Sequence, residues 1–284
     1  MDSKNSGTLF LCATPIGNLE DITYRVVRVL KEVDLIAAED TRNSIKLLNH
    51  LDIHTPMTSY HEFNKYDKAE ELVEKLQAGM NIALITDAGT PAISDPGEIL
   101  VKLCHEKGVS VTSLPGPAAC ITGLALSGMS SRRFCFEGFL PYDKKERLTI
   151  LKELETELRT IILYEAPHHL VKTLTELAEH LGENREITLL RELTKKHEEA
   201  YKATIKECLA RYENEEPRGE CVIIAAGLDR KELEEEKKKN FEELGLDKHM
   251  ELYLSQGYDR KEAMKLVAKD LGVSKRDIYQ KLNT

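Results

Sequence analysis

The chain reads Asn81-Ile-Ala-Leu-Ile-Thr-Asp-Ala-Gly-Thr-Pro91 and later Val109-Ser-Val-Thr-Ser-Leu-Pro-Gly-Pro-Ala118, and these two stretches decide the fold. Each is a short apolar run that ends in a turn containing proline and glycine, and a helical pattern over Pro96–Lys107 separates them. A strand, helix, strand unit of this kind brings both turns to one edge of a parallel sheet. Ligands of α/β proteins bind at that edge, so the two turns are predicted to share one ligand.

Length and composition predict an ordinary globular protein. With 284 residues, the chain can form two modest domains and a small extra module. No apolar run approaches the ~20 residues that a membrane helix needs, and the apolar stretch after the polar Met1–Gly7 is shorter than a secretory signal. We therefore expect a cytoplasmic protein without a membrane partner.

The six cysteines predict buried free thiols in a reducing compartment, because they are far apart and form no C-x-x-C pair. His50 and His54 have helical i, i+4 spacing, but no Glu lies between them and Pro56 follows closely. No third ligand is suggested either. We predict no metal site.

The charge is unevenly distributed along the chain. The formal net charge of −9 argues against loose, salt-driven binding to nucleic acid. Between Arg260 and Thr284, however, seven Lys or Arg face three Asp or Glu, which gives +4 at this end. This basic end could hold RNA, or it could be a solvated helical face.

The pattern predicts an α/β protein of three parts. Residues 1–116 alternate strands with amphipathic helices and form a parallel-type sheet. Residues 117–228 carry further strands, and the short spacing between Glu186–Leu190 and Tyr201–Ile205 predicts a mixed sheet. Residues 229–284 begin with a charged linker or exposed helix, Lys231–Lys239, and continue into a helical, helix-turn-helix-like tail.

The turn at Asp87 suits a nucleoside-like ligand. Gly89 allows the backbone to approach the ligand closely, and the carboxylate can accept hydrogen bonds from its hydroxyl or amino groups. An alternative is a surface turn in which Asp87 accepts only backbone N–H groups. A third turn of the same kind, Pro15-Ile-Gly17-Asn18, follows the first strand, and the chain contains no phosphate-binding glycine motif.

Six ordered motifs resemble those of the ribosomal RNA small subunit methyltransferase I family, over about Thr8 to Gly227. They are Ala13-Thr-Pro-Ile-Gly-Asn-Leu-Glu-Asp-Ile-Thr23, Ala37-Ala-Glu-Asp-Thr-Arg42, Asp87-Ala-Gly-Thr-Pro-Ala-Ile-Ser-Asp-Pro-Gly97, Leu114-Pro-Gly-Pro-Ala118, Glu137-Gly-Phe-Leu-Pro141 and Arg191-Glu-Leu-Thr-Lys195. The resemblance implies the tetrapyrrole-methylase fold, with S-adenosyl-L-methionine (SAM) held between two α/β domains. It also implies a homodimer that methylates the ribose 2′-oxygen of a cytidine in the decoding region of 16S rRNA, within an assembled or nearly assembled small subunit.

Carried over by residue, the resemblance assigns the cofactor to three turns and to the end of a strand in the second domain. The implied cofactor-binding residues are Ile16, Gly17, Asp87, Gly89, Thr90, Ala118, Ala119, Tyr164 and Glu165. One motif departs from the wider fold family, which usually opens with G-x-G-P-G-D, whereas this chain has Thr14-Pro-Ile-Gly17-Asn18. The departure makes a porphyrinoid substrate less expected.

A ribose hydroxyl is a weak nucleophile, so methyl transfer needs a group that takes or holds its proton. The candidates are Glu39, Asp40 and Lys195. For Glu39 and Asp40, the alternative is a structural ion pair with Arg42. We expect Arg42, Arg191, Lys275 and Arg276 to contact RNA phosphates. Two other functions remain open: a ligand-sensing regulator that binds nucleic acid, and a methylase of a small tetrapyrrole.

Overall fold

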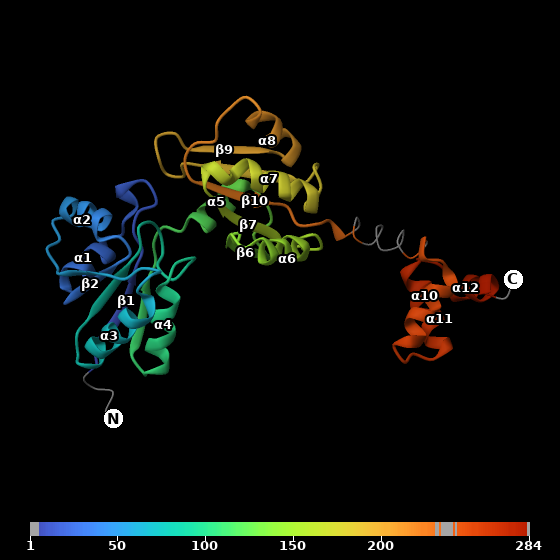
Figure 1. The fold of residues 1–284 in the computed structure, drawn as a ribbon, viewed down its shortest axis with the longest axis horizontal. Helices are drawn as coiled ribbons and strands as arrows, with labels where there is room; N and C mark the ends of the chain where they lie inside the picture. The colour runs from blue at the N-terminus through green and yellow to red at the C-terminus, as the bar shows by residue number, and fades with distance from the viewer. Residues whose placement is uncertain (1–5, 231–232, 234–240, 242, 283–284) are drawn as a thin grey trace. The chain divides into compact units, whose positions relative to one another are not determined.

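The computed structural model describes residues 6–230, 233, 241 and 243–282 (Figure 1). Its contacts divide the chain into two compact units, residues 1–151 with 160–226 and residues 152–159 with 227–284. The predicted linker Lys231–Lys239 falls almost entirely outside the described residues. Among those that are described, no helix has both the length and the apolar character needed to cross a membrane.

The first sheet is parallel and is covered on both faces. Its order is β3-β2-β4-β1-β5, with β1 (Thr8–Cys12), β2 (Leu35–Ala38), β3 (Met57–Ser59), β4 (Ile82–Ile85) and β5 (Ser110–Leu114). Helices α1 (Tyr24–Glu32) and α2 (Thr41–His50) supply one core, and α3 (Lys65–Gln77) and α4 (Gly97–Glu106) supply the other. Because apolar residues alternate between these cores, the strands read as nearly continuous hydrophobic runs.

The second sheet is mixed, as its short connections predicted. Its order is β6-β7-β10-β8-β9, with β6 (Phe134–Phe139), β7 (Thr160–Glu165), β8 (Glu186–Arg191), β9 (Glu199–Thr204) and β10 (Cys221–Ala225). β6 and β7 are parallel, and the other pairings are antiparallel. The helices of this lobe are α5 (Ala119–Ser127), α6 (Lys144–Leu154), α7 (Pro167–Leu181) and α8 (Ile205–Tyr212). α5 packs on the sheet at Gly123, where a Cβ would lie 3.2 Å from Val222.

The described part of the tail forms three short helices around a small core. These are α10 (Leu246–Ser255), α11 (Arg260–Asp270) and α12 (Lys275–Leu282). Ala263, Val267 and Ile278 are fully buried between them. Ser274 precedes α12 and accepts a hydrogen bond from the backbone N–H of Asp277, so its side chain caps the helix.

The helix after β4 begins one residue later than the helical pattern over Pro96–Lys107 predicted, because α4 starts at Gly97 and Pro96 is its cap residue. The Asp95 carboxylate accepts the Gly97 N–H at 2.7 Å. The loop before Pro96 has left-handed backbone at Ala92 and Ser94.

Gly116 lies where the turn after β5 passes the end of β1. A Cβ built on Gly116 would lie 2.5 Å from the Cβ of Ala13, which real Cβ atoms do not approach so closely. Glycine is needed here for space, since its backbone is not in the left-handed region.

Replacement Gly116→Ala is expected to push the turn away from β1 and to lower the free energy of unfolding by about 1–3 kcal/mol, the usual cost of overpacking. Urea unfolding followed by circular dichroism measures this loss. Ser113→Ala, at an exposed position of β5, is the matched control and should change stability little. A Gly116→Ala midpoint equal to that of the control would contradict the packing argument.

Candidate active site

Backbone pairing joins the loops that follow β1 and β4. The Thr14 N–H donates to the Gly89 carbonyl at 2.9 Å, and the Gly89 N–H donates back to the Thr14 carbonyl at 3.1 Å. The buried Thr14 hydroxyl also donates to the Thr86 carbonyl. The two turns thus form one continuous surface at the carboxyl edge of the sheet.

The turn after β5 is joined to the same surface. The Thr90 hydroxyl donates to the Pro117 carbonyl at 2.9 Å. Gly89 has φ +87°, a backbone conformation in which other residues are strained. A Cβ at this position would lie 3.4 Å from the Ile16 side chain. The three turns singled out by the sequence therefore meet, although β1 lies between β4 and β5 in the sheet.

A cavity of about 370 Å³ opens between these turns and the second lobe. This volume falls within the ~300–1,000 Å³ of small-molecule sites. Ten of the residues proposed from the sequence line it: Ile16, Glu39, Asp87, Gly89, Thr90, Ala118, Ala119, Tyr164, Glu165 and Lys195. Residues from both lobes are thus brought to one cavity.

The remaining proposed residues do not line this cavity. Gly17 lies against the opposite loop, where a Cβ would be 2.5 Å from the Lys195 side chain, so it sets how closely the two loops approach. Asp40, Arg42 and Arg191 lie outside the cavity lining. Lys275 and Arg276 belong to the other compact unit, at the start of α12.

Asp40 and Arg42 form a local structural pair. Asp40 is the N-cap of α2, and its carboxylate accepts hydrogen bonds from the Arg42 backbone and guanidinium. These bonds lower the pKa of Asp40 to about 2. The Arg42 side chain is 88% exposed. The ion-pair alternative left open by the sequence therefore describes Asp40, whose lone pairs are already engaged.

Glu39 points instead toward the loop after β4. Its Oε2 accepts hydrogen bonds from the Thr86 hydroxyl at 2.5 Å and from the Asp87 backbone N–H at 3.4 Å. Since β2 and β4 are neighbours, the carboxylate at the end of one strand reaches the turn of the next. Glu39 thus lines the cavity, and its Oε1 takes no part in these two hydrogen bonds.

Burial raises the pKa of two further carboxyl groups in the cavity, Asp87 and Asp95. Asp87 accepts a hydrogen bond from the Asn43 side chain at 3.3 Å, which opposes the effect of burial. Both carboxylate oxygens of Asp95 already accept hydrogen bonds, one from the backbone N–H of Ile93 and the other from that of Gly97. Asp87 is therefore better placed than Asp95 to accept hydrogen bonds from a ligand.

Lys195 is held as a cation. Burial lowers the pKa of its ammonium, but ion pairs with Glu192 at 3.0 Å and Glu220 at 3.6 Å outweigh burial and raise that pKa overall. A lysine in this state keeps its proton at neutral pH. Its position favours holding negative charge over accepting a proton.

Aromatic rings of the second lobe form the facing wall. Tyr164 packs edge-on against Phe136 and Phe139, with ring centroids 5.0 Å and 5.5 Å apart. The Tyr164 hydroxyl accepts the Cys120 backbone N–H at the start of α5. Gly138, at a bulge in β6 with φ +62°, brings Phe139 to the cavity lining.

The sequence did not assign roles to several lining residues. These include Thr86, Asp95, Phe139, Glu192, Glu220 and Cys221. Asp95, Phe139 and Glu192 lie inside the quoted motifs, so position within a motif could have found them. Glu220 and Cys221 carried no such signal, because the antiparallel pairing of β10 with β7 and β8 brings them to the site.

Arg191 of β8 is engaged by a carboxylate of the neighbouring strand. Its guanidinium pairs with Glu199 of β9, which also binds Arg211. Arg211 in turn lies over the Tyr201 ring, 4.9 Å from its centroid. This network joins β8, β9 and α8, so Arg191 helps to hold these three elements together.

Comparisons with known proteins place the chain in a family. The model of the Tetrapyrrole (Corrin/Porphyrin) Methylases matches residues 8–209. The ribosomal RNA small subunit methyltransferase I of Synechocystis sp. is 45% identical, with 96% of each chain covered. That of Bacillus subtilis is 46% identical over 97% of this chain and 94% of the relative. The chain belongs to the ribosomal RNA small subunit methyltransferase I family.

Family membership confirms the resemblance drawn from the six motifs. Solved structures confirm the fold alone: uroporphyrin-III C-methyltransferase from Thermus thermophilus superposes with a TM-score of 0.55 at 17% identity, covering 78% of this chain and 92% of that one. That structure is a complex with S-adenyl homocysteine. The wider fold is therefore that of the tetrapyrrole methylases, with two α/β lobes.

Proposed function

We propose that the protein is a SAM-dependent methyltransferase that modifies the ribose 2′-oxygen of a cytidine in the decoding region of 16S rRNA. The observation that carries the proposal is near-full-length identity of 45–46% to small subunit rRNA methyltransferases. Its substrate is rRNA within an assembled or nearly assembled small subunit, and the reaction takes place in the cytoplasm. A homodimer is part of the proposal, and the exposed Ile121 and Leu126 of α5 offer apolar surface for it.

The lining chemistry supports a cationic, nucleoside-like cofactor. Six carboxyl groups line the cavity: Glu39, Asp87, Asp95, Glu165, Glu192 and Glu220. Among the described lining residues, Lys195 is the single Lys or Arg. Bound SAM supplies a methyl group activated by a positively charged sulfonium. An acidic, partly apolar cavity favours such a cation and disfavours a polyphosphate.

Individual residues are suited to particular parts of the cofactor. Asp87 can accept hydrogen bonds from hydroxyl or amino groups, and Gly89 and Thr90 let the backbone approach closely. Ile16, Ala118 and Ala119 provide small apolar surface on one side, and Tyr164 provides an aromatic edge on the other. These residues fit an adenosyl group in size and polarity. Methyl transfer then depends mainly on orientation and on exclusion of water.

We assign to Glu39 the role of accepting the proton of the ribose hydroxyl. Its carboxylate lines the cavity and can accept a proton or a hydrogen bond. Lys195, held as an ammonium, stabilises the oxygen as its proton leaves. Asp40 is not retained as a base, because its oxygens cap α2 and bind Arg42.

Replacement Asp87→Ala is expected to weaken SAM binding about tenfold or more, because hydroxyl donors of the cofactor lose a charged acceptor. Burial raises the Asp87 pKa, so the wild-type affinity should fall as pH drops through that raised pKa and the acceptor becomes protonated. Calorimetry across pH measures both effects. Asp67→Ala, at an exposed position of α3, is the control; equal affinities in both variants would count against the site.

Replacement Glu39→Gln should lower the methyl-transfer rate about a hundredfold or more, since general-base help contributes ~10²–10⁴. Binding of SAM should change far less than the rate. The measurement is the transfer of tritiated methyl groups to small subunits that lack the modification. Asp40→Asn is the matched neighbour and should retain the wild-type rate, because Asn still caps a helix. A fully active Glu39→Gln enzyme would remove Glu39 from the chemistry.

The tail is proposed to engage rRNA through Lys275 and Arg276, with Arg42 and Arg191 contributing on the α/β unit. Arg276 is exposed, and the Arg42 guanidinium is solvent-facing. The acidic body suggests that docking depends on shaped RNA rather than on any single strand.

Removal of residues 245–284 should raise the KM for small subunits about tenfold and leave SAM affinity unchanged, because the described cavity lies in the other unit. The double replacement Lys275→Glu/Arg276→Glu should act in the same direction and reduce the salt dependence of binding. Lys102→Glu, on an exposed position of α4, controls for net charge. Equal subunit binding by the truncated protein would mean that the three helices only pack together.

The target nucleotide is tested by mapping methylated nucleosides in rRNA from cells that lack the protein. Loss of one ribose-methylated cytidine in the decoding region, restored by the wild-type gene, supports the proposal. Full retention of every ribose methyl group would refute it. Sedimentation of the purified chain measures the proposed dimer.

A further inference from the structure

A chain of buried polar side chains runs behind the cavity in the second lobe. Glu165 ends β7 and lines the cavity with 6% of its surface exposed. Thr173 of α7 is 1% exposed, and its hydroxyl donates to Glu165 Oε2 at 2.5 Å. Arg147 of α6 is 9% exposed, and its Nη2 donates to the Thr173 hydroxyl at 2.7 Å. Three elements therefore meet in one hydrogen-bonded series.

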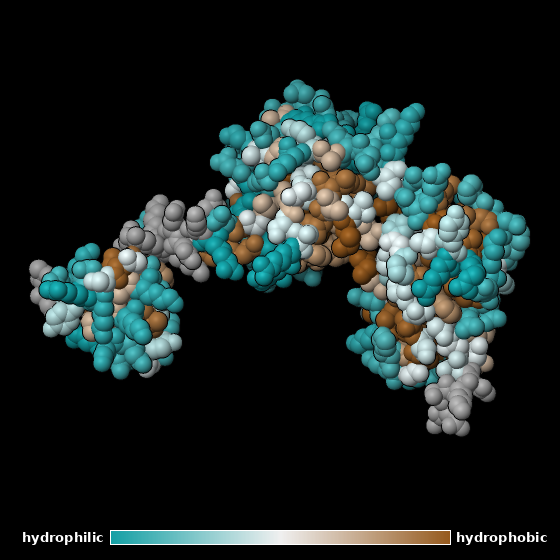
Figure 2. Space-filling view, turned by 180° about the vertical axis from the view of Figure 1, so that it is seen from behind, coloured by the Kyte–Doolittle hydropathy of each residue, from teal (hydrophilic) through white to brown (hydrophobic). Residues whose placement is uncertain are grey.

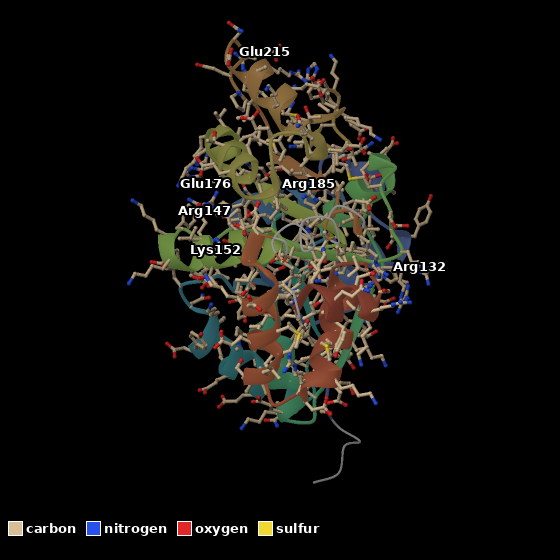
Figure 3. All side chains as sticks on the ribbon, turned by 90° about the vertical axis from the view of Figure 1, so that its right-hand side faces the viewer. Arg132, Arg147, Lys152, Glu176, Arg185 and Glu215 are labelled. Atoms are coloured by element: carbon tan, nitrogen blue, oxygen red, sulfur yellow. The ribbon has the colours of Figure 1, made fainter. Side chains whose placement is uncertain are left out.

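The last member of the series is Glu176, one helical turn beyond Thr173. Arg147 Nε donates to Glu176 Oε2 at 2.7 Å, and an Nη2 contact of 2.6 Å completes a forked ion pair. Figure 3 shows the labelled Arg147 and Glu176 side chains next to one another. Because Glu176 balances the arginine charge, Arg147 acts on Glu165 chiefly through the Thr173 hydroxyl.

The direction of this series is determined by chemistry. A guanidinium has only donors, so the Thr173 oxygen must accept from Arg147. The single hydroxyl proton is then free to point only at Glu165, whose Oε2 must accept it. Glu165 Oε1 accepts the Ala166 backbone N–H at 2.8 Å. Both oxygens of Glu165 thus accept hydrogen bonds from the protein, which fixes the orientation of the carboxylate.

We infer that Arg147 and Thr173 are positioning residues that orient Glu165 as a hydrogen-bond acceptor for donor groups of the cofactor. The inference rests on the proposed function, because the donors are those of SAM. The carboxylate is buried, so its remaining lone pairs are available only toward the cavity. A freely rotating Glu165 would not hold its acceptor oxygens toward the cofactor and would weaken such contacts.

The same arginine also supports the neighbouring wall. Arg147 Nη1 donates to the Leu140 carbonyl at 3.4 Å. Leu140 follows Phe139, whose ring packs on Tyr164 at the cavity. The hydrogen bonds of the Thr173 hydroxyl go to Arg147 and Glu165 and not to this wall, so replacements of Thr173 separate the effect on Glu165 from the effect on the aromatic residues.

The charged and titratable groups around Glu165 come from several elements. Cys221 of β10 pairs with Glu165 in register, and burial raises its pKa to about 12, so it is a neutral thiol. The others are Arg147 on α6, Glu176 on α7, and the cavity residues Glu39, Asp87, Asp95, Glu192, Lys195 and Glu220.

The test compares Thr173→Val, which removes the hydroxyl at nearly constant shape, with Thr173→Ser, which keeps it. At pH 7, Thr173→Val should weaken SAM binding about tenfold by calorimetry, and Thr173→Ser should bind nearly as the wild type. Thr175→Val on the same helix is the control, since Thr175 bonds only its own helix at Val171.

A second measurement does not depend on the cofactor. Crystal structures without cofactor should show the Glu165 side chain in one orientation in the wild type and Thr173→Ser, and displaced from it in Thr173→Val. An unchanged Glu165 orientation in Thr173→Val would overturn the inference. So would equal SAM affinity of the wild type and Thr173→Val. If the Glu165 side chain moves in Thr173→Val but the wild type binds no SAM, the positioning role stands while the proposed function fails.

Discussion

The site depends on the mutual backbone pairing of Thr14 and Gly89. Two parallel strands that are neighbours in the sheet end side by side, but their loops would diverge without a contact beyond the ladder. The reciprocal hydrogen bonds at 2.9 and 3.1 Å extend the pairing past the strand ends. The hydrogen bond from the Thr90 hydroxyl to the Pro117 carbonyl joins the third loop to the other two. Gly116 approaches Ala13 so closely that there is no space for a side chain between them. Contacts within the protein therefore hold one wall of the cavity together.

The opposite wall is held by different means. Aromatic edges of Phe136, Phe139 and Tyr164 pack together, and a buried polar series stands behind Glu165. Loops on both walls carry non-glycine residues in left-handed backbone, among them Ser94, Glu192 and Thr194. Such conformations cost about 1–3 kcal/mol each and persist only where surrounding contacts require them. Hydrophobic surface on the lobe that carries α5 is visible in the space-filling view (Figure 2).

Electrostatics distinguish the residues inside the cavity from those outside it. Inside, carboxylates dominate and Lys195 is neutralised by Glu192 and Glu220. Outside, Arg42 is exposed and Arg191 is engaged by Glu199. This separation suits an enzyme that binds a small cation in a buried place and a polyanion on its surface. It also explains why adjacent Glu39 and Asp40 differ: one faces the cavity and the other caps a helix.

The sequence alone determined the α/β class, the parallel and mixed sheets and the three turns, because strand periodicity and proline–glycine turns are local signals. Most of the ten lining residues named from the sequence came from the family resemblance, which six local motifs carry. Tertiary structure decided which of two neighbouring carboxylates enters the cavity, how Glu220 and Cys221 reach it across antiparallel strands, and that Lys195 is ion-paired. It also showed that Arg147 lies behind Glu165, 18 positions away in the chain. Such pairings arise from strand order and side-chain direction, which residue patterns along the chain do not encode.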